Sequence, residues 1–216
     1  MDALSPVSLL LLANSDMPPL RLPFTLTLLA ALVGTAIWTN THRGAIGEDD
    51  LRDYGYAPRH LLGFEWRRIF SSIFMTVGGW RFYASLLATA VFVGRLEWIY
   101  GATRTAVFFF AIHVATLLIE SAAIIAPLRF FRHPLGNALH LTHDVGPSAG
   151  YYGCFGAVLS LSGFSAPFIG IVALYLALRI VRSLFFVGKN EPDLSADIAH
   201  LIAFTLGLAW GSVGQA

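Results

Sequence analysis

A serine and a histidine in two separate apolar segments have the residue types needed for nucleophilic catalysis. Ser148 stands at the start of the segment 146–156, which reads GPSAGYYGCFG and follows a polar loop. His200 forms an Ala-His pair with Ala199 inside the last apolar segment of the chain. A serine hydroxyl becomes a nucleophile when a neighbouring base takes its proton, and histidine is suited to that role. We therefore predict that Ser148 and His200 form a nucleophile–base pair.

Both residues also have a purely structural interpretation. Ser148 is then a helix cap, and His200 a hydrogen-bonded packing residue. At a helix N-terminus, however, the free backbone N–H groups and the helix dipole also stabilise the oxyanion of a tetrahedral intermediate. A Gly-x-Ser motif recurs by chance, so its pairing with an Ala-His in the last apolar segment carries more weight than the motif alone.

Glycines at helical spacing predict how close the two helices come. Gly150, Gly153 and Gly156 leave one face of the first helix almost bare of side chains, and a bare face lets a neighbouring helix approach. Gly207 and Gly211 form a GxxxG pair in the last apolar segment. We therefore expect this last segment to pack directly against the glycine face.

Composition places the chain among integral membrane proteins. Of its 216 residues, 56 % are hydrophobic and 12 % charged, with a mean hydropathy of +0.67, whereas a soluble domain carries about 25 % charged residues. The net charge of +1 favours no nucleic-acid partner, and the single cysteine excludes an intrachain disulfide. The length suits about six spans of ~20 residues. We expect an all-α, polytopic membrane protein with six transmembrane helices in a lipid bilayer.

The expected spans can be read along the chain. They cover residues 22–38, 82–100, 103–127, 148–161, 168–187 and 194–210. The fourth is short, which fits a helix that starts below the membrane surface in a water-filled indentation. Residues 22–214 are thus expected to form the membrane domain. Residues 1–21 have two interpretations, an interfacial anchor or a disordered tail, and we favour the tail.

The longest stretch between spans, residues 40–80, mixes arginines and carboxylates with aromatic residues. Without a long apolar run, this pattern is typical of a segment lying in the headgroup layer, and a solvated loop is the alternative. In the loop 128–147, His140, His143 and Asp144 have the residue types of metal ligands. Their spacing is loose and no thiol or carboxylate cluster accompanies them, so we predict no metal site.

His113 and Glu120 are ionisable residues inside the third span, where such groups face the protein interior or a polar cavity. Seven residues separate them, so they share a helix face but lie about two turns apart. A proton or ion relay is one hypothesis, and a polar anchor between packed helices is the commoner interpretation. A small transporter built on this pair would be expected to show an inverted repeat or broken helices, and the sequence shows neither.

Together these motifs resemble the rhomboid intramembrane serine proteases over residues 22–211. The motifs that carry the resemblance are Trp66-Arg67, Gly94-Arg95-Leu96-Glu97 with Gly101, Gly146-Pro147-Ser148, Tyr152 with Gly153 and Gly156, and Ala199-His200. The resemblance implies a six-span core and a Ser–His dyad without a catalytic carboxylate or cofactor. It also implies that Gly146 and Tyr152 line the site, and that the substrates are transmembrane proteins.

One position departs from the family pattern. Rhomboids carry a His and an Asn, four residues apart, at the start of the second span, where they help to hold the oxyanion. One register places Arg81 and Ser85 there, so that Ser85 donates a hydrogen bond and Arg81 supplies charge. The other places Phe82 and Leu86 there and leaves backbone amides alone. Losing one oxyanion donor costs a factor of ~10²–10³ in rate. The alternative function is therefore a rhomboid-like pseudoprotease that binds membrane proteins without cleaving them.

Two questions stay open at the level of sequence. Asp197 lies one turn before His200 and either orients it or is a favourable partner of the helix dipole near a helix start, and we favour the second. Arginines gather in the loops on the Ser148 side, so the positive-inside rule places that side in the cytoplasm. The family resemblance implies the opposite orientation. The oligomeric state is not encoded in any motif.

Overall fold

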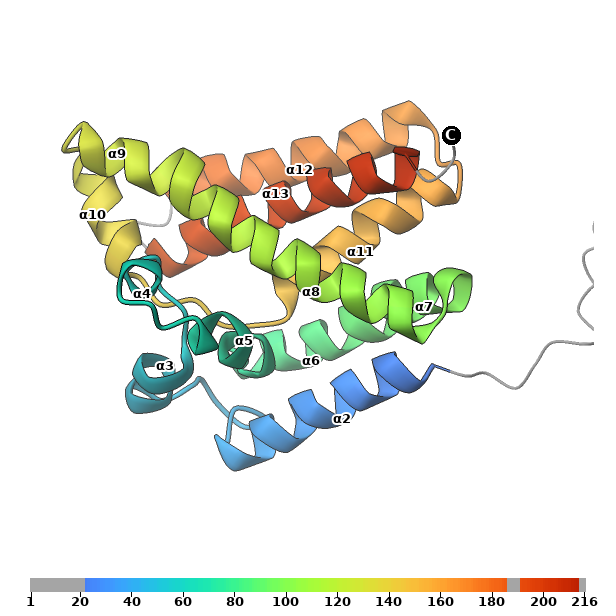
Figure 1. Ribbon diagram of the computed structural model, residues 1–216, viewed down its shortest axis with the longest axis horizontal. Coiled ribbons are helices and arrows are strands. Elements are labelled where there is room, and N and C mark those ends of the chain that lie inside the picture. Colours follow the sequence, from blue (N-terminus) through green and yellow to red (C-terminus); the bar gives the residue numbers. More distant parts are fainter. Residues whose placement is uncertain (1–21, 186–190, 214–216) are drawn as a thin grey trace, which may run out of the picture.

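Helices make up most of the described chain. The computed structural model describes residues 22–185 and 191–213, and no strand occurs within these ranges (Figure 1). The expected tail, residues 1–21, lies outside the described residues. The helices of the bundle are α2 (Pro23–Trp38), α6 (Trp80–Ala88), α7 (Gly94–Tyr100), α8 (Ala102–Ile119), α9 (Ala126–Phe130), α11 (Ser148–Leu161), α12 (Ala166–Phe185) and α13 (Glu191–Val213).

Two long helices contain π-helical turns. The turn Thr89–Val93 joins α6 to α7, and the turn Glu120–Ile125 joins α8 to α9. The third span therefore continues past Pro127, where the sequence suggested an end, because this proline falls in the first turn of α9. A proline is tolerated in a first helical turn, and a π-turn relieves the hydrogen-bond ladder before it.

Four helical segments of the described chain are long and apolar enough to cross a membrane. They are Trp80–Tyr100, Ala102–Phe130, Ala166–Phe185 and Asp193–Ser212. The other two expected spans are shorter helices. At 1.5 Å per residue, α2, with 16 residues, is about 24 Å long, and α11, with 14 residues, is about 21 Å long. The chain is an all-α, multi-pass membrane protein.

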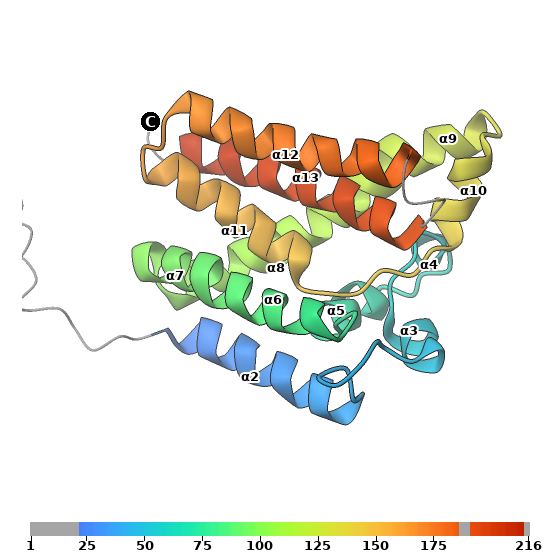
Figure 2. The same cartoon turned by 180° about the vertical axis from the view of Figure 1, so that it is seen from behind.

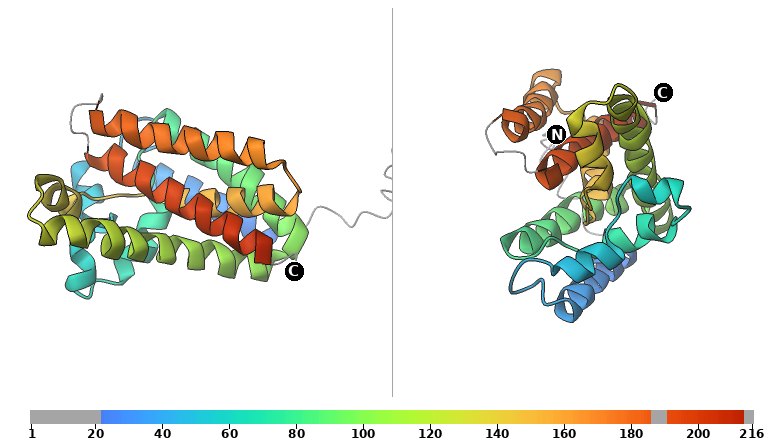
Figure 3. Two further views of the ribbon diagram at one scale, coloured as in Figure 1. Left: turned by 90° about the horizontal axis from the view of Figure 1, so that it is seen from above. Right: turned by 90° about the vertical axis from the view of Figure 1, so that its left-hand side faces the viewer.

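The short helix α11 occupies the interior of the bundle. In both views along the short axis it lies between α13 and the α6–α7 helix, with α2 at one edge and α12 at the other (Figures 1 and 2). Figure 3 shows α12 running beside α13 along the bundle. A helix that other helices surround does not have to match the full thickness of the bilayer, which explains how so short an element is accommodated.

The predicted close approach of α11 and α13 is present. A Cβ atom added at Gly207 would overlap the carbonyl oxygen of Gly153, and one at Gly156 would overlap the carbonyl oxygen of Phe204. At Gly211 the added atom would lie 2.7 Å from the Ser160 Cβ. The two backbones touch where side chains are missing, so larger residues at these positions would force the helices apart.

The other two glycines of α11 face a different neighbour. Atoms added at Gly150 and Gly153 would overlap the side chains of Phe109 and Ile112, which belong to α8. The prediction that all three glycines face the last helix is therefore wrong for Gly150, whereas Gly153 faces α8 on its Cβ side and meets Gly207 of α13 at its carbonyl oxygen. The glycine spacing shows that neighbours come close, but α11 is narrow on two sides and receives α8 on one and α13 on the other.

Short helices of the two large loops gather at one end of the bundle. They are α3 (Glu48–Tyr54), α4 (Arg59–Leu62), α5 (Arg67–Phe74) and α10 (Pro134–Leu141) (Figure 1). Tyr56 and Asp144 form an antiparallel bridge, with N···O distances of 3.0 and 2.7 Å, and the Gly146 N–H donates to the Ser72 carbonyl at 2.8 Å. The first loop thus clamps the loop that leads into Ser148.

An arginine next to the expected Trp-Arg motif holds the first loop together. Arg68, rather than Arg67, donates from Nη1 to the carbonyl oxygens of Arg52 and Asp53, at 2.6 and 2.8 Å, and pairs with Glu65. These bonds fold α3 back onto the start of α5. The Trp66-Arg67 motif lies in the segment that folds against α3, but the arginine that forms these bonds is Arg68.

Glu97 caps a helix from a distance in the sequence. Its carboxylate accepts from the backbone N–H groups of Phe24 and Thr25, at 2.9 and 2.7 Å, and from the Thr25 hydroxyl at 2.6 Å. These are the N–H groups that the first turn of α2 leaves without partners, and a negative charge is favourable at that end of the helix dipole.

His113 and Glu120 each bind a different neighbour. His113 Nε2 lies 3.1 Å from the Ile69 carbonyl oxygen, to which it donates, and Glu120 Oε1 accepts from the Ser195 hydroxyl at 2.7 Å. Both side chains are almost fully buried. One anchors α8 to the first loop and the other anchors the same long helix to α13, as expected for polar anchors between packed segments.

Candidate active site

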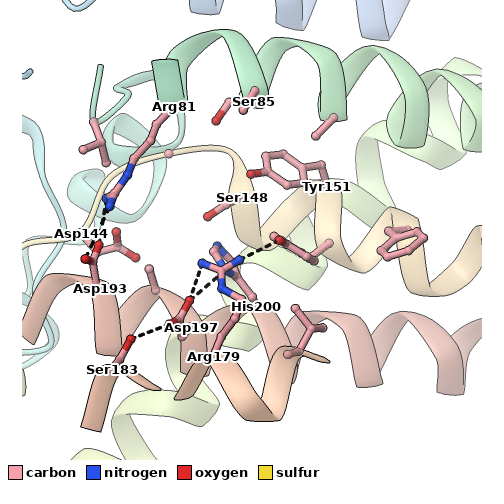
Figure 4. A pocket seen from close by; sticks show the side chains of 18 of the residues that line it. Arg81, Ser85, Asp144, Ser148, Tyr151, Arg179, Ser183, Asp193, Asp197 and His200 are labelled. Carbon is pink, nitrogen blue, oxygen red and sulfur yellow. Dashed lines mark hydrogen bonds and ion pairs between the residues drawn. The ribbon is translucent and has the colours of Figure 1, made fainter. Parts of the chain in front are cut away.

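A pocket of about 670 Å³ opens among α6, α11, α12 and α13, and both Ser148 and His200 line it (Figure 4). The rest of the wall is a mixture of apolar and polar side chains, including Tyr151, Tyr152 and Arg179. A recess of this size with polar groups in its wall can admit water together with part of a polypeptide.

Ser148 is the first residue of α11, and its approach requires an unusual backbone. Gly146 has a φ of +131°, a region that residues with side chains rarely occupy, and it also lines the pocket. The first hydrogen bond of the helix runs from the Tyr151 N–H to the Pro147 carbonyl at 3.0 Å. The N–H groups of Ser148 and Ala149 therefore have no partner within the helix and face its N-terminal end.

His200 enters the pocket from α13 with only 7 % of its surface exposed. Its ring stacks on Tyr152, with a centroid distance of 4.2 Å and an interplanar angle of 27°. Neither ring nitrogen has a hydrogen-bond partner among the described residues. Ser148 and His200 thus share a pocket without a direct hydrogen bond, and a free enzyme often tightens such a contact only when substrate is bound.

Asp197 is bound to the neighbouring helix rather than placed at a helix start. Its Oδ2 accepts from the Ser183 hydroxyl at 2.7 Å, and its Oδ1 lies 2.5 Å from Arg179 Nη2. The dipole interpretation is wrong, because α13 begins at Glu191 and Asp197 follows more than one turn later. The same Oδ1 lies 3.9 Å from His200 Nδ1.

Arg179 and Ser183 of α12 are site residues that sequence reasoning did not assign. Besides its contact with Asp197, Arg179 donates from Nη1 to the Tyr152 hydroxyl at 3.2 Å. One signal was available, because an arginine inside an apolar span normally faces the protein interior and marks a polar site. Its partner is not predictable from sequence, since it lies on another helix.

On the α6 side, the structure distinguishes the two registers for the family's His/Asn positions. Arg81 and Ser85 line the pocket, whereas Phe82 is buried in the bundle core. Ser85 forms a side-chain hydrogen bond with Tyr151. Arg81 Nη1 lies 2.8 Å from Asp193 Oδ1, across the pocket rim (Figure 4). The first register therefore faces the site.

Comparison with protein-family models matches residues 63–215 to the Rhomboid domain. The chain belongs to the rhomboid family. The match begins within the first loop, before α5, and covers every helix that contributes to the pocket. A search of curated proteins finds no match to the chain. The comparisons therefore show the family, and the arrangement of the pocket residues is the evidence on activity.

Asp144 lines the pocket from the loop before Ser148, outside the membrane spans, and its pKa is clearly shifted. Burial raises the pKa of Asp144 to about 6, against the hydrogen bond that its Oδ1 accepts from the Val145 N–H at 2.8 Å. Burial lowers the pKa of His60 to about 4, and the Arg68 charge acts in the same direction. Both of the paired loops therefore contain a group that titrates in mildly acidic solution.

His143 is engaged in this loop cluster and does not point to a metal site. Its Nε2 lies 3.1 Å from Arg59 Nη2, which can only donate, so the histidine lone pair is already used. Burial and the Arg59 charge lower the pKa of His143. Among the described residues, no three His, Cys, Asp or Glu side chains are grouped to hold an ion.

Proposed function

We propose that this rhomboid-family protein is an intramembrane serine protease that cleaves transmembrane protein substrates with a Ser148–His200 dyad. The observation that carries the proposal is the meeting of a serine at a helix N-terminus and a histidine of a second helix in one pocket of about 670 Å³. Helix packing explains the close approach of α11 and α13, but it does not explain a buried imidazole with two unpaired nitrogens.

The chemistry follows the roles available to the two residues. Ser148 Oγ attacks the scissile carbonyl carbon while His200 takes the hydroxyl proton, which gives a tetrahedral oxyanion. The C–N bond then breaks, and His200 gives the proton to the leaving amine. Water attacks the resulting acyl-enzyme and loses a proton to His200, and the C–O bond to Ser148 breaks as the serine recovers that proton.

Oxyanion stabilisation would come from the start of α11. The N–H groups of Ser148 and Ala149 point out of the first turn, at the positive end of the helix dipole. Ser85 of α6 lies on the opposite wall of the pocket and is the side-chain candidate for a further donor. These donors would replace the His/Asn pair that the family pattern places on the second span.

A rhomboid-like protein that binds membrane proteins without cleaving them is the second candidate. The observation that favours it is the absence of a hydrogen bond between Ser148 and His200 in the described structure, together with the Arg179 guanidinium near the base. A cation close to the base opposes the imidazolium ion that proton transfer creates. The two candidates therefore differ in whether Ser148 is activated.

Fluorophosphonate labelling of the detergent-solubilised protein tests this difference. In the reaction the Ser148 Oγ–P bond forms, the P–F bond breaks, fluoride leaves, and the hydroxyl proton passes to His200. The parent, Ser148→Ala and His200→Ala are compared, with Ser165→Ala as a control serine in the turn before α12, outside the pocket lining. We expect labelling in the parent and the control, and none in the two dyad variants.

The alternative result is equally informative. If the parent is folded, as judged by its thermal unfolding, and still takes up no label, Ser148 is not activated and the binding function becomes the better account. If His200→Ala labels as fast as the parent, His200 is not the base.

A further inference from the structure

Four side chains, one of them His200, form a closed ring of contacts that involves three helices. His200 stacks on Tyr152 of α11, the Tyr152 hydroxyl accepts from Arg179 of α12, and Arg179 pairs with Asp197 of α13. The ring closes at the 3.9 Å separation between Asp197 Oδ1 and His200 Nδ1 (Figure 4). The proposed dyad uses none of these contacts.

The carboxylate in this ring is held on both oxygens. Ser183 donates to Oδ2, Arg179 lies against Oδ1, and the side chain of Asp197 is 6 % exposed. Asp197 and His200 are three residues apart on a helix, so they lie on the same face one turn apart. A carboxylate fixed in this way cannot turn to solvent, and the unpaired Nδ1 of His200 is the polar atom that it faces.

The charges also suit a proton-accepting histidine. Before reaction, Arg179 and Asp197 form a neutral pair, which satisfies a carboxylate that would be costly to bury alone. When His200 takes a proton, the new positive charge forms close to the Arg179 guanidinium and would be repelled by it. The carboxylate, whose Oδ1 lies 3.9 Å from Nδ1, offsets this repulsion, so the pair tolerates the imidazolium ion only as long as Asp197 is charged.

We propose that Asp197 is a positioning residue for His200, which it orients through Nδ1–H so that the Nε2 lone pair is left for Ser148. The inference rests on the proposed function for its catalytic meaning. It goes beyond a two-residue dyad, because a carboxylate from the same helix then selects the tautomer of the base. In serine proteases with a triad, the carboxylate acts on the same ring nitrogen.

A spectroscopic test does not depend on activity. The full chain, labelled with ¹⁵N-histidine in detergent micelles, gives ring-nitrogen shifts that report which nitrogen carries the proton, and His200→Ala identifies the His200 signals by their loss. We expect the proton on Nδ1 in the parent, and a shift of population towards Nε2–H in Asp197→Asn, whose amide can donate to Nδ1. A parent His200 protonated on Nε2 overturns the proposal.

Fluorophosphonate labelling rates give the functional test. Asp197→Asn should label at least ~10-fold more slowly than the parent, within the ~10⁴-fold loss seen when a triad carboxylate becomes an amide. Arg179→Gln/Asp197→Asn restores a neutral pair without the carboxylate. It should recover thermal stability and stay slow. Recovery of the labelling rate together with stability would show that Asp197 only pairs with Arg179, and would overturn the proposal.

A buried carboxylate outside the pocket supplies the control. Glu120 is not among the residues that line the pocket, and it accepts from the Ser195 hydroxyl of α13, a contact that Glu120→Gln retains through its amide oxygen. Glu120→Gln should label at the parent rate, and an equal loss in this variant would overturn the assignment to Asp197. An unlabelled parent with the Nδ1–H tautomer defeats the protease proposal alone. A labelled parent whose Asp197→Asn variant labels equally fast defeats only this inference.

Discussion

Glu97 and Asp197 are both carboxylates buried on membrane helices, with exposed fractions of 2 % and 5 %. Glu97 is surrounded by donors that need it, because its oxygens accept two backbone N–H groups and one hydroxyl of α2. Asp197 is bound to Ser183 and Arg179 on one side and faces the unpaired imidazole of His200 on the other. The Glu97 carboxylate has hydrogen-bond donors on both oxygens, whereas the His200 nitrogens beside Asp197 have no hydrogen-bond partner among the described residues.

The difference separates a structural polar group from a functional one. A buried donor or acceptor without a partner costs free energy, so such a group calls for an explanation. At Glu97 nothing remains to be bound, and the carboxylate ties α2 to α7. At His200 both nitrogens remain without a partner in the pocket that Ser148 also lines, where the proposed reaction would use them. We therefore expect mutations at the first site to affect stability and those at the second to affect reactivity.

The largest effect on stability is expected for Glu97→Ala. The change leaves the N–H groups of Phe24 and Thr25 and the Thr25 hydroxyl buried without an acceptor, at ~1–3 kcal/mol for each unsatisfied group. We expect a loss of about 3 kcal/mol or more in the free energy of unfolding, measured by denaturant titration in micelles. The fluorophosphonate labelling rate of the protein that remains folded should not change. Loss of labelling without loss of stability would reverse the roles assigned to the two carboxylates.

A second prediction concerns how pH affects the stability of the loop that leads into Ser148 and of the first loop that binds it. The raised pKa of Asp144 favours the folded state at low pH, and this contribution is lost as the pH rises through about 6. The lowered pKa of His60 acts in the opposite sense, since its contribution is present above about 6.5 and is lost as the pH falls towards 4. In the parent the two partly cancel between pH 4 and 6.5.

Asp144→Asn removes one of the two opposing contributions and keeps the acceptor for the Val145 N–H. The variant should be more stable than the parent at pH 7, where the parent holds a buried charge. It should also lose more stability than the parent when the pH falls from 7 to 4.5. Melting temperatures measured across this range check the result, and parallel curves for parent and variant would rule out Asp144 as a titrating group of the loop.

Much of the fold was predictable because it depends on local patterns. The apolar segments, the short helix that starts at Ser148 and the approach of α11 to α13 follow from hydrophobicity and glycine spacing. The match of residues 63–215 confirms the family that the Gly146-Pro147-Ser148 and Ala199-His200 motifs indicated. The dyad itself stays a prediction, since the structure brings the two residues into one pocket without a hydrogen bond between them.

What the sequence did not disclose are the contacts between segments far apart in the chain. Glycine spacing shows that a helix approaches, but not that Phe109 of α8 takes the place opposite Gly150. An arginine in α12 signals a polar site, but not that Asp197 is its partner. The role of Glu97 depends on the start of α2, more than 70 residues earlier, and no local pattern links the two.

Thr25→Val is expected to have a moderate effect, and it sharpens the account of Glu97. The valine has nearly the same shape and removes only the hydroxyl that donates to the carboxylate at 2.6 Å. The two backbone N–H groups continue to bind, so we expect a loss of about 1.5–3 kcal/mol in the free energy of unfolding, which is the value of one hydrogen bond to a charged group. A loss as large as that of Glu97→Ala would mean that the hydroxyl, and not the helix N-terminus, is the partner that matters.

The smallest effect is expected for Arg81→Ala at the pocket rim. The ion pair with Asp193 is half in solvent, with Arg81 side-chain exposure of 47 %, and such pairs contribute about 0–1 kcal/mol. Thermal unfolding should therefore change little. Labelling decides a second point, because the register that faces the pocket allows the Arg81 charge to serve the oxyanion. If labelling falls in Arg81→Ala but not in Asp193→Asn, the arginine acts on the transition state. The residues that act on the reaction would then include Arg81 of α6 as well as those of α13, while Glu97 would remain a structural residue.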